Sequence, residues 1–139
     1  MLTTLSCIAV AVYFEARGES MLGQRAVAEV ILNRVIDPRW PDTACEVIKQ
    51  KNQFSFYSDG LSDKPTDAAV YALAEFAASD AIKGNTLHTG ALYYHATYVQ
   101  PVWRHKLERL GRIEGHIFYG DKTFAPKTSI RPKATPLNG

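Results

Sequence analysis

A break between two helical patterns near the N-terminus constrains this chain more than any other feature. The apolar run from Ile8 to Phe14 predicts a mostly buried helix, and Gly18 is typical of a helix end. Ser20 then fits the N-cap of a second, amphipathic helix. The two helices must therefore be joined by a short loop, and Glu15 stands where the first helix ends.

The position of Glu15 indicates chemistry as well as structure. Burial beside apolar groups raises the pKa of a carboxyl group, which keeps such a group protonated near neutral pH. A protonated carboxyl group can donate its proton to a leaving group. We therefore interpret Glu15 as a catalytic acid, and its alternative role is that of a buried structural carboxylate.

Length and composition limit the classes of protein that remain. A chain of 139 residues with 46% hydrophobic and 22% charged residues fits one globular domain, which we expect to be a monomer. The net charge of +2 is too small to argue for a nucleic-acid partner. No apolar run approaches the ~20 residues of a membrane span. The first residues lack the positive start of a secretory signal peptide.

Capping residues, helix-breaking residues and hydrophobic periodicity predict where the other elements lie. The sequence predicts helices over 3–17, 21–36, 44–50 and from a cap at Thr66 to about 83, and a pair of strands over 91–95 and 116–119. A basic stretch, 104–112, lies between the strands, and a tail with several prolines follows from 121. The expected fold is therefore α+β and mostly helical, with a small antiparallel β-ribbon, in a domain over 1–120 and a tail over 121–139.

Cys7 and Cys45 leave two interpretations open. Free cysteines are often buried in the core, so the pair can be two buried thiols. Alternatively, a disulfide ties the first helix to the segment after the second and favours an oxidising compartment.

Several motifs along the chain resemble one known family. They are Tyr13-Phe14-Glu15-Ala16-Arg17-Gly18-Glu19, Gly23-Gln24 with Ala26-Val27-Ala28, Val30-Ile31-Leu32-Asn33-Arg34-Val35, Gln53-Phe54-Ser55, Tyr93-Tyr94-His95-Ala96 with Val99, Pro101 and Trp103, and Gly115-His116-Ile117-Phe118-Tyr119. Together they resemble the cell wall hydrolase family of spore-cortex lytic enzymes, the SleB/CwlJ type, over about residues 5–120.

The resemblance implies a lysozyme-like enzyme that cuts peptidoglycan glycan strands between N-acetylmuramic acid and N-acetylglucosamine. Enzymes of this type are lytic transglycosylases, and their single catalytic glutamate corresponds to Glu15. The resemblance implies no metal or organic cofactor. It also implies action at the cell wall, in the periplasm, outside the cell, or as a phage endolysin released to the wall.

Other polar and aromatic residues are candidates for substrate binding, each with a structural alternative. Glu19 can support the site or lie in solvent at a helix start, and Gln24 and Asn33 can bind the glycan or the backbone. The remaining candidates are Ser55, Tyr94, His95 and Trp103. Aromatic rings suit stacking on sugars, although one of the tyrosines at 93 and 94 can face the core instead.

The competing functions differ in the groups that they require. A hydrolytic glycosidase needs a second carboxylate, for which Asp59 and Asp63 are the loop candidates. A metal-dependent peptidase is weakly supported because none of the four histidines has His-Glu-x-x-His spacing. A glycan-binding module without catalysis gains little from a carboxyl group at an apolar helix end. The sequence therefore favours transglycosylation, in which the substrate supplies the nucleophile.

Overall fold

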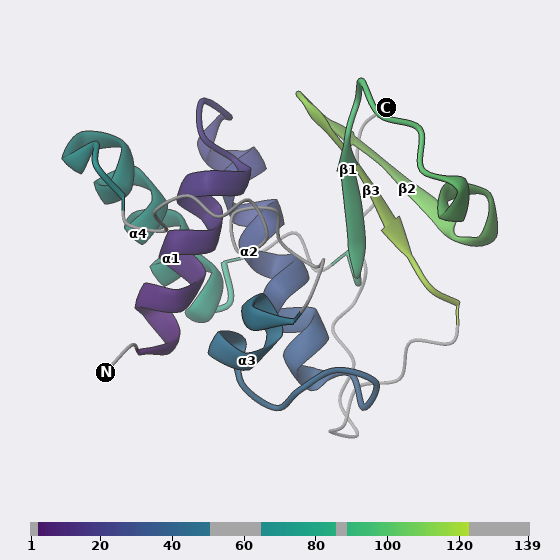
Figure 1. Ribbon diagram of the computed structural model, residues 1–139, viewed down its shortest axis with the longest axis horizontal. Helices are drawn as coiled ribbons and strands as arrows, with labels where there is room; N and C mark the ends of the chain where they lie inside the picture. Colours follow the sequence, from purple (N-terminus) through teal and green to yellow (C-terminus); the bar gives the residue numbers. More distant parts are fainter. Residues whose placement is uncertain (1–2, 51–64, 86–88, 123–139) are drawn as a thin grey trace.

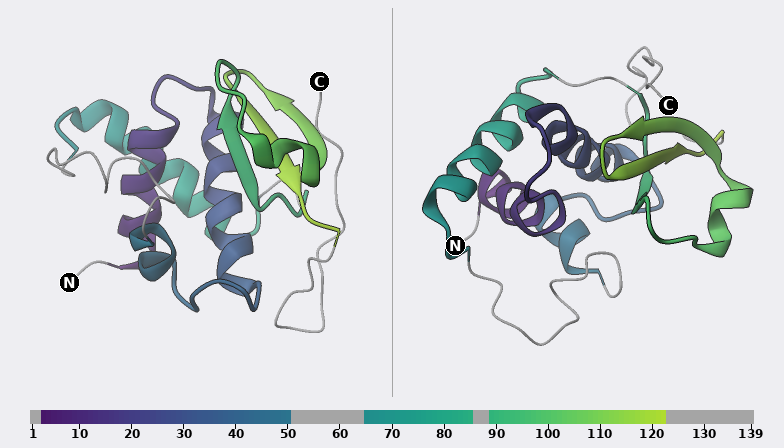
Figure 2. Two further views of the ribbon diagram at one scale, coloured as in Figure 1. Left: turned by 45° about the vertical axis from the view of Figure 1, so that its right-hand side comes forward. Right: turned by 90° about the horizontal axis from the view of Figure 1, so that it is seen from above.

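The computed structural model describes residues 3–50, 65–85 and 89–122, which form a helical layer beside a small sheet. The elements are α1 (Thr4–Glu15), α2 (Met21–Ile36), α3 (Ala44–Lys49), α4 (Ala68–Ile82), β1 (Tyr93–Ala96), the 3-10 helix η2 (Val102–Lys106), β2 (Glu108–Ile113) and β3 (His116–Gly120). Figures 1 and 2 show α2 between α1 and the sheet. The mostly helical α+β fold expected from the sequence is confirmed.

Side-chain caps set where the helices begin. Ser20 accepts a hydrogen bond from the Gly23 N–H at the start of α2, whose bounds match the prediction. The first helix ends two residues earlier than predicted, because Ala16 leaves the helical conformation (φ −125°) before Gly18 turns the chain at φ +85°. The cap of α4 is Asp67 and not Thr66, and its carboxylate accepts from the Val70 N–H. Among the described residues, none of the helices is long and apolar enough to cross a membrane.

The core lies among the four helices and the inner face of the sheet. Its buried apolar residues include Ile8 and Val12 of α1, Val27 and Ile31 of α2, and Phe118 of β3. A disulfide joins Cys7 to Cys45, with Cα atoms 5.2 Å apart, and so ties α1 to α3. The disulfide interpretation is therefore the one that the structure supports.

The sheet has three strands in the described part of the chain, in the order β1-β3-β2. The predicted antiparallel pairing of β1 with β3 is confirmed, with Tyr94 opposite Phe118. Strand β2 was missed because its sequence, Glu-Arg-Leu-Gly-Arg-Ile, is rich in charge and lacks clear alternation. A register shift between Arg109 and Gly111 interrupts its pairing with β3, and Gly111 tolerates the positive φ of 145° there.

A stripe of three polar side chains on α2, those of Glu29, Asn33 and Arg34, fixes the segment that leads into β1. The Glu29 carboxylate accepts from the Thr89 hydroxyl (2.7 Å), and the Asn33 amide donates to the Ala91 carbonyl (2.9 Å). Arg34 donates to the next carbonyl, that of Leu92, at 2.8 Å. These side chains are buried, so the stripe bonds the backbone internally and sets where β1 begins.

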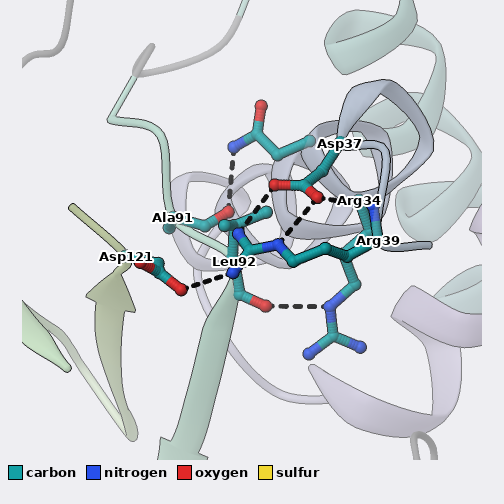
Figure 3. Close-up of polar contacts among 7 residues, drawn as sticks. Arg34, Asp37, Arg39, Ala91, Leu92 and Asp121 are labelled. Carbon is teal, nitrogen blue, oxygen red and sulfur yellow. Dashed lines mark hydrogen bonds and ion pairs between the residues drawn. The ribbon is translucent and has the colours of Figure 1, made fainter. Parts of the chain in front are cut away.

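A charged cluster closes the C-terminal end of α2 (Figure 3). Asp37 accepts from the backbone N–H of Arg39 and from its Nε and Nη2 atoms, at 2.8, 2.9 and 2.8 Å. Arg39 also reaches Asp121, just beyond β3, at 2.6 Å. Burial raises the pKa of the Asp37 carboxyl, but the hydrogen bonds and charge of Arg39 outweigh burial and lower it below its usual value. Residue 121, the first of the predicted tail, is thus bonded to the helical layer.

We expect Asp37→Asn to lower the free energy of unfolding by about 1–3 kcal/mol at neutral pH, because charge-assisted hydrogen bonds are lost. Because the pKa of Asp37 is lower in the folded state, its contribution to the free energy of unfolding is present above about pH 4. This contribution is lost as the pH falls through the pKa of the folded state. Urea unfolding at several pH values checks this, with the exposed Glu75→Gln as control. A difference from the wild type that stayed constant down to pH 2 would contradict it.

Candidate functional site

Glu15 is the last residue of α1 and is partly buried. Its charge acts on the Tyr94 hydroxyl of β1. Burial raises the pKa of the Tyr94 hydroxyl well above its usual value, and the charge of Glu15 raises it further. The Tyr94 ring also packs against His116 and Phe118 of β3. The carboxylate and the phenol therefore share one site between the helical layer and the sheet.

The turn between β2 and β3 meets the loop between α1 and α2 at this site. Glu114, in the turn, has a positive φ of 46°, which is uncommon for a residue with a side chain. Its carboxylate accepts from the Ser20 N–H at 3.2 Å. Glu19 reaches the other way: its Oε1 atom lies 3.0 Å from the Gly115 N–H and 3.0 Å from Nδ1 of His116. These contacts lock the sheet onto the loop that follows Glu15.

Two glycines make room for Glu19. A Cβ atom on Gly115 would lie 3.2 Å from the Glu19 carboxylate, and one on Gly23 would lie 3.1 Å from the Glu19 Cβ atom. In a capping box, the position of Gly23 would hold a glutamate whose side chain accepts from the N-cap N–H. At the start of α2, Gly23 instead lets Glu19 pack closely against the helix. Glu19 is consequently enclosed and paired, unlike the solvated residue that was its structural alternative.

The carboxylates around Glu15 accept hydrogen bonds from protein groups. The Oε1 atom of Glu19 accepts from the Gly115 N–H and lies within bonding distance of His116 Nδ1. Elsewhere among the described residues, hydrogen bonds are also accepted by the carboxylates of Glu29, Asp37, Glu46, Asp67, Asp80, Glu114 and Asp121. Asp67 also forms an ion pair with Arg17 at 3.4 Å.

The structure separates three of the predicted substrate-binding residues. Tyr94 faces the helices, whereas its neighbour His95 faces the opposite side, because side chains alternate along a strand. Trp103 of η2 packs edge-on against His95 and Tyr119 on that outer side, with ring centroids 5.7 and 5.4 Å away. Of these three, Tyr94 alone shares the site of Glu15. A substrate role for His95 and Trp103 remains a prediction for a different surface.

The two predicted amides bind the backbone. Gln24 donates to the Glu19 carbonyl at 3.1 Å, and Asn33 donates to that of Ala91. They shape the Glu19 loop and the entry to β1, and contact with glycan stays a prediction. Ser55, Asp59 and Asp63 lie outside the described residues. In the part of the chain that is described, no group of three His, Cys, Asp or Glu side chains is placed to hold a metal ion.

Sequence reasoning missed His116 and Arg34 as parts of this region. His116 binds Glu19 and packs on Tyr94, so it connects the loop after Glu15 to the sheet. Arg34 is 5% exposed, and its guanidinium lies over the rings of Trp40 and Tyr93. Both residues stand in motifs that resemble the family, and that was the signal in the sequence that could have found them.

Comparison with known proteins identifies the family of this chain. The family model described as Cell Wall Hydrolase matches residues 18–119, which begin three residues after Glu15. A spore cortex-lytic enzyme of Halalkalibacterium halodurans is 37% identical over 115 residues, covering 82% of this chain and 34% of that protein. One from Bacillus subtilis is 39% identical over 116 residues, covering 80% and 35%. The chain thus spans about a third of the length of these relatives.

Two solved structures share the fold. The catalytic domain of the germination-specific lytic transglycosylase SleB from Bacillus anthracis has a TM-score of 0.71 and 35% identity, covering 84% of this chain and 93% of that one. The catalytic domain of the Bacillus cereus SleB protein has a TM-score of 0.72 and 36% identity, covering 84% and 88%. The family match, the identities and the shared architecture lead to one conclusion: this chain belongs to the cell wall hydrolase family and is a homologue of SleB catalytic domains.

Proposed function

We propose that this domain is a lytic transglycosylase that cuts peptidoglycan between N-acetylmuramic acid and N-acetylglucosamine. The observation that carries the proposal is the position of Glu15, at the end of α1 where its charge acts on Tyr94, while the neighbouring Glu19 is bound by the β2–β3 turn. The SleB domain from Bacillus anthracis, which this chain resembles over most of its length, is described as a lytic transglycosylase. By this likeness, the substrate is wall or spore-cortex peptidoglycan outside the cytoplasm.

In the proposed reaction Glu15 first acts as an acid. It donates its proton to the glycosidic oxygen, the bond from that oxygen to C1 of the muramoyl residue breaks, and the N-acetylglucosamine 4-hydroxyl leaves. The Glu15 carboxylate then takes the proton of the muramoyl 6-hydroxyl. The freed oxygen attacks C1 and closes a 1,6-anhydro ring, which returns Glu15 to its protonated form. Holding the nucleophile within the substrate gives it a high effective concentration.

A hydrolase would need a second carboxylate near Glu15, at about 5–5.5 Å for retention or about 6.5–9.5 Å for inversion. Glu19 is the nearest acidic residue in the motif, and its contacts with Gly115 and His116 support a structural role. The bacterial relatives named above give no support to a phage endolysin. We also propose that the catalytic unit extends over 1–120 and that 121–139 lies outside it.

We expect the protein to clear suspensions of purified peptidoglycan, and to do so equally well with EDTA present. Glycosidic cleavage needs no metal in this scheme, so soluble glycan fragments should appear without new free amino groups. Turbidity and amine titration measure the two effects. Clearing that stopped with EDTA and released amines would indicate a metal-dependent peptidase, and binding without clearing would indicate a glycan-binding module.

A further inference from the structure

A pocket of about 360 Å³ lies on the outer face of the sheet, the face turned away from Glu15. It is lined by His95, Thr97, Val99, Gln100, Arg104, His105, Arg109, Ile117 and Tyr119. These residues come from all three strands, from η2 and from the loop between β1 and η2. The proposed reaction uses none of them.

Strand register explains why these side chains converge. Arg109 of β2 lies directly opposite Tyr119 of β3, and His95 of β1 lies opposite Ile117. Directly opposed residues of an antiparallel pair project to the same face. Tyr94 belongs to the alternate set, which faces the helices, so the pocket and the Glu15 site are on opposite sides of one sheet.

The floor of the pocket is built and fixed. Nε2 of His95 lies 2.8 Å from the Tyr119 hydroxyl, and Nδ1 lies 2.7 Å from the Ala96 carbonyl oxygen. A carbonyl oxygen only accepts, so Nδ1 carries a proton and donates it. His95 is 8% and Tyr119 is 4% exposed, and the Trp103 ring packs edge-on against both. A rigid aromatic floor of this kind presents a fixed surface to a ligand.

The rim of the pocket is basic. Arg104 and Arg109 contribute guanidinium groups and His105 an imidazole, and no carboxylate occurs among the described residues that line it. Arg104 is held in place by its bond to the Pro101 carbonyl at 3.0 Å. Guanidinium forks match the planar geometry of a carboxylate. Val99 and Ile117 add apolar wall, and Thr97 and Gln100 add hydrogen-bonding groups.

We propose that this pocket binds the carboxylate-bearing stem peptide of peptidoglycan. This proposal rests on the proposed function, because it takes peptidoglycan as the substrate. A short acidic peptide combines carboxylates, amide groups and aliphatic side chains. The guanidinium groups, the hydrogen-bonding side chains and the apolar wall of the pocket are the complementary groups. A polymer of phosphodiesters favours a long basic groove over a compact pocket with apolar walls. A peptide held on the outer face leaves the inner face, with Glu15 and Tyr94, to the glycan strand.

Binding of a synthetic stem tetrapeptide, L-Ala-γ-D-Glu-meso-diaminopimelate-D-Ala, tests the pocket by calorimetry without any cleavage. Arg109→Gln should weaken binding by about 10–100-fold, the usual effect of losing a charge-assisted hydrogen bond. Lys49→Gln removes one positive charge from an exposed position at the end of α3, outside the lining, and should change Kd less than about twofold. Equal losses in both variants, absence of peptide binding, or tighter binding of a poly(glycerol phosphate) chain would overturn the proposal.

Cleavage assays separate this proposal from the proposed function. On glycan strands stripped of their peptides by an amidase, Arg109→Gln should match the wild type, whereas on intact strands its KM should rise. Identical kinetics of the two proteins on intact strands would overturn the pocket as a stem-peptide site. Peptide binding by a protein that cleaves neither substrate would support the pocket and reject the transglycosylase.

Discussion

Replacing Glu15 with glutamine is expected to slow peptidoglycan cleavage by about 10²–10⁴-fold and to leave the fold unchanged. The amide has nearly the same shape as the carboxyl group but cannot donate or take the proton that the reaction requires. Glu15 is also the last residue of α1, so the substitution lies at the end of the helix and not in its middle. Initial rates of turbidity loss, with circular dichroism and thermal melting as checks on folding, measure both parts of the expectation.

Glu19→Gln is the matched comparison, because it makes the same change four residues later. Its oxygen can still accept from Gly115 and lie beside His116, so the rate should fall much less than in Glu15→Gln. Near-normal activity in a folded Glu15→Gln protein, together with a large loss in Glu19→Gln, would move the acid to Glu19 and contradict the assignment.

Loss of the Cys7–Cys45 disulfide should lower the free energy of unfolding by about 3–4 kcal/mol, because the disulfide closes a loop of 38 residues and so restricts the unfolded chain. For a domain of this size the melting temperature should fall on the order of 10 °C. Cleavage at 25 °C should persist, since Cys7 lies in the first half of α1 and Glu15 at its end. Thermal melting with and without a reducing agent gives the measurement.

The Cys7→Ala/Cys45→Ala double variant serves as the control for the disulfide. It should melt at the temperature of the reduced protein and should not respond to the reducing agent. If thiol titration showed full reduction while the wild-type melting temperature stayed unchanged, the stabilising role of the disulfide would be refuted.

Local signals in the sequence were enough to place the helices. The Ser20 cap and the predicted range of 21–36 agree with the bounds of α2, because caps and helix breakers act over one turn of helix. The charged strand β2 escaped detection, since its pairing with β3 depends on a partner and a bulge at Gly111 and not on its own alternation. Pairing of Cys7 with Cys45 likewise depends on how α1 and α3 pack.

The candidate site could be predicted only in part, for a similar reason. Glu15 was proposed as the acid from its place at an apolar helix end and from the family motif, and that role stays a prediction. The partners of Glu19 are about a hundred residues away in sequence, in a turn whose approach no local pattern indicates. Tyr94 and His95 are adjacent in the chain but face opposite sides of the sheet. Which of the two neighbours lies on the side of Glu15 is decided by strand register, which the sequence alone left open.

Mass spectrometry of the glycan ends released from purified peptidoglycan tests the central claim most directly. If Glu15 acts alone and the muramoyl 6-hydroxyl is the nucleophile, every new muramoyl end should be a 1,6-anhydro ring. Such ends have lost one water relative to a hydrolysis product and are not reduced by borohydride. New ends that are all reducible by borohydride would contradict the transglycosylase and would require a second carboxylate beside Glu15.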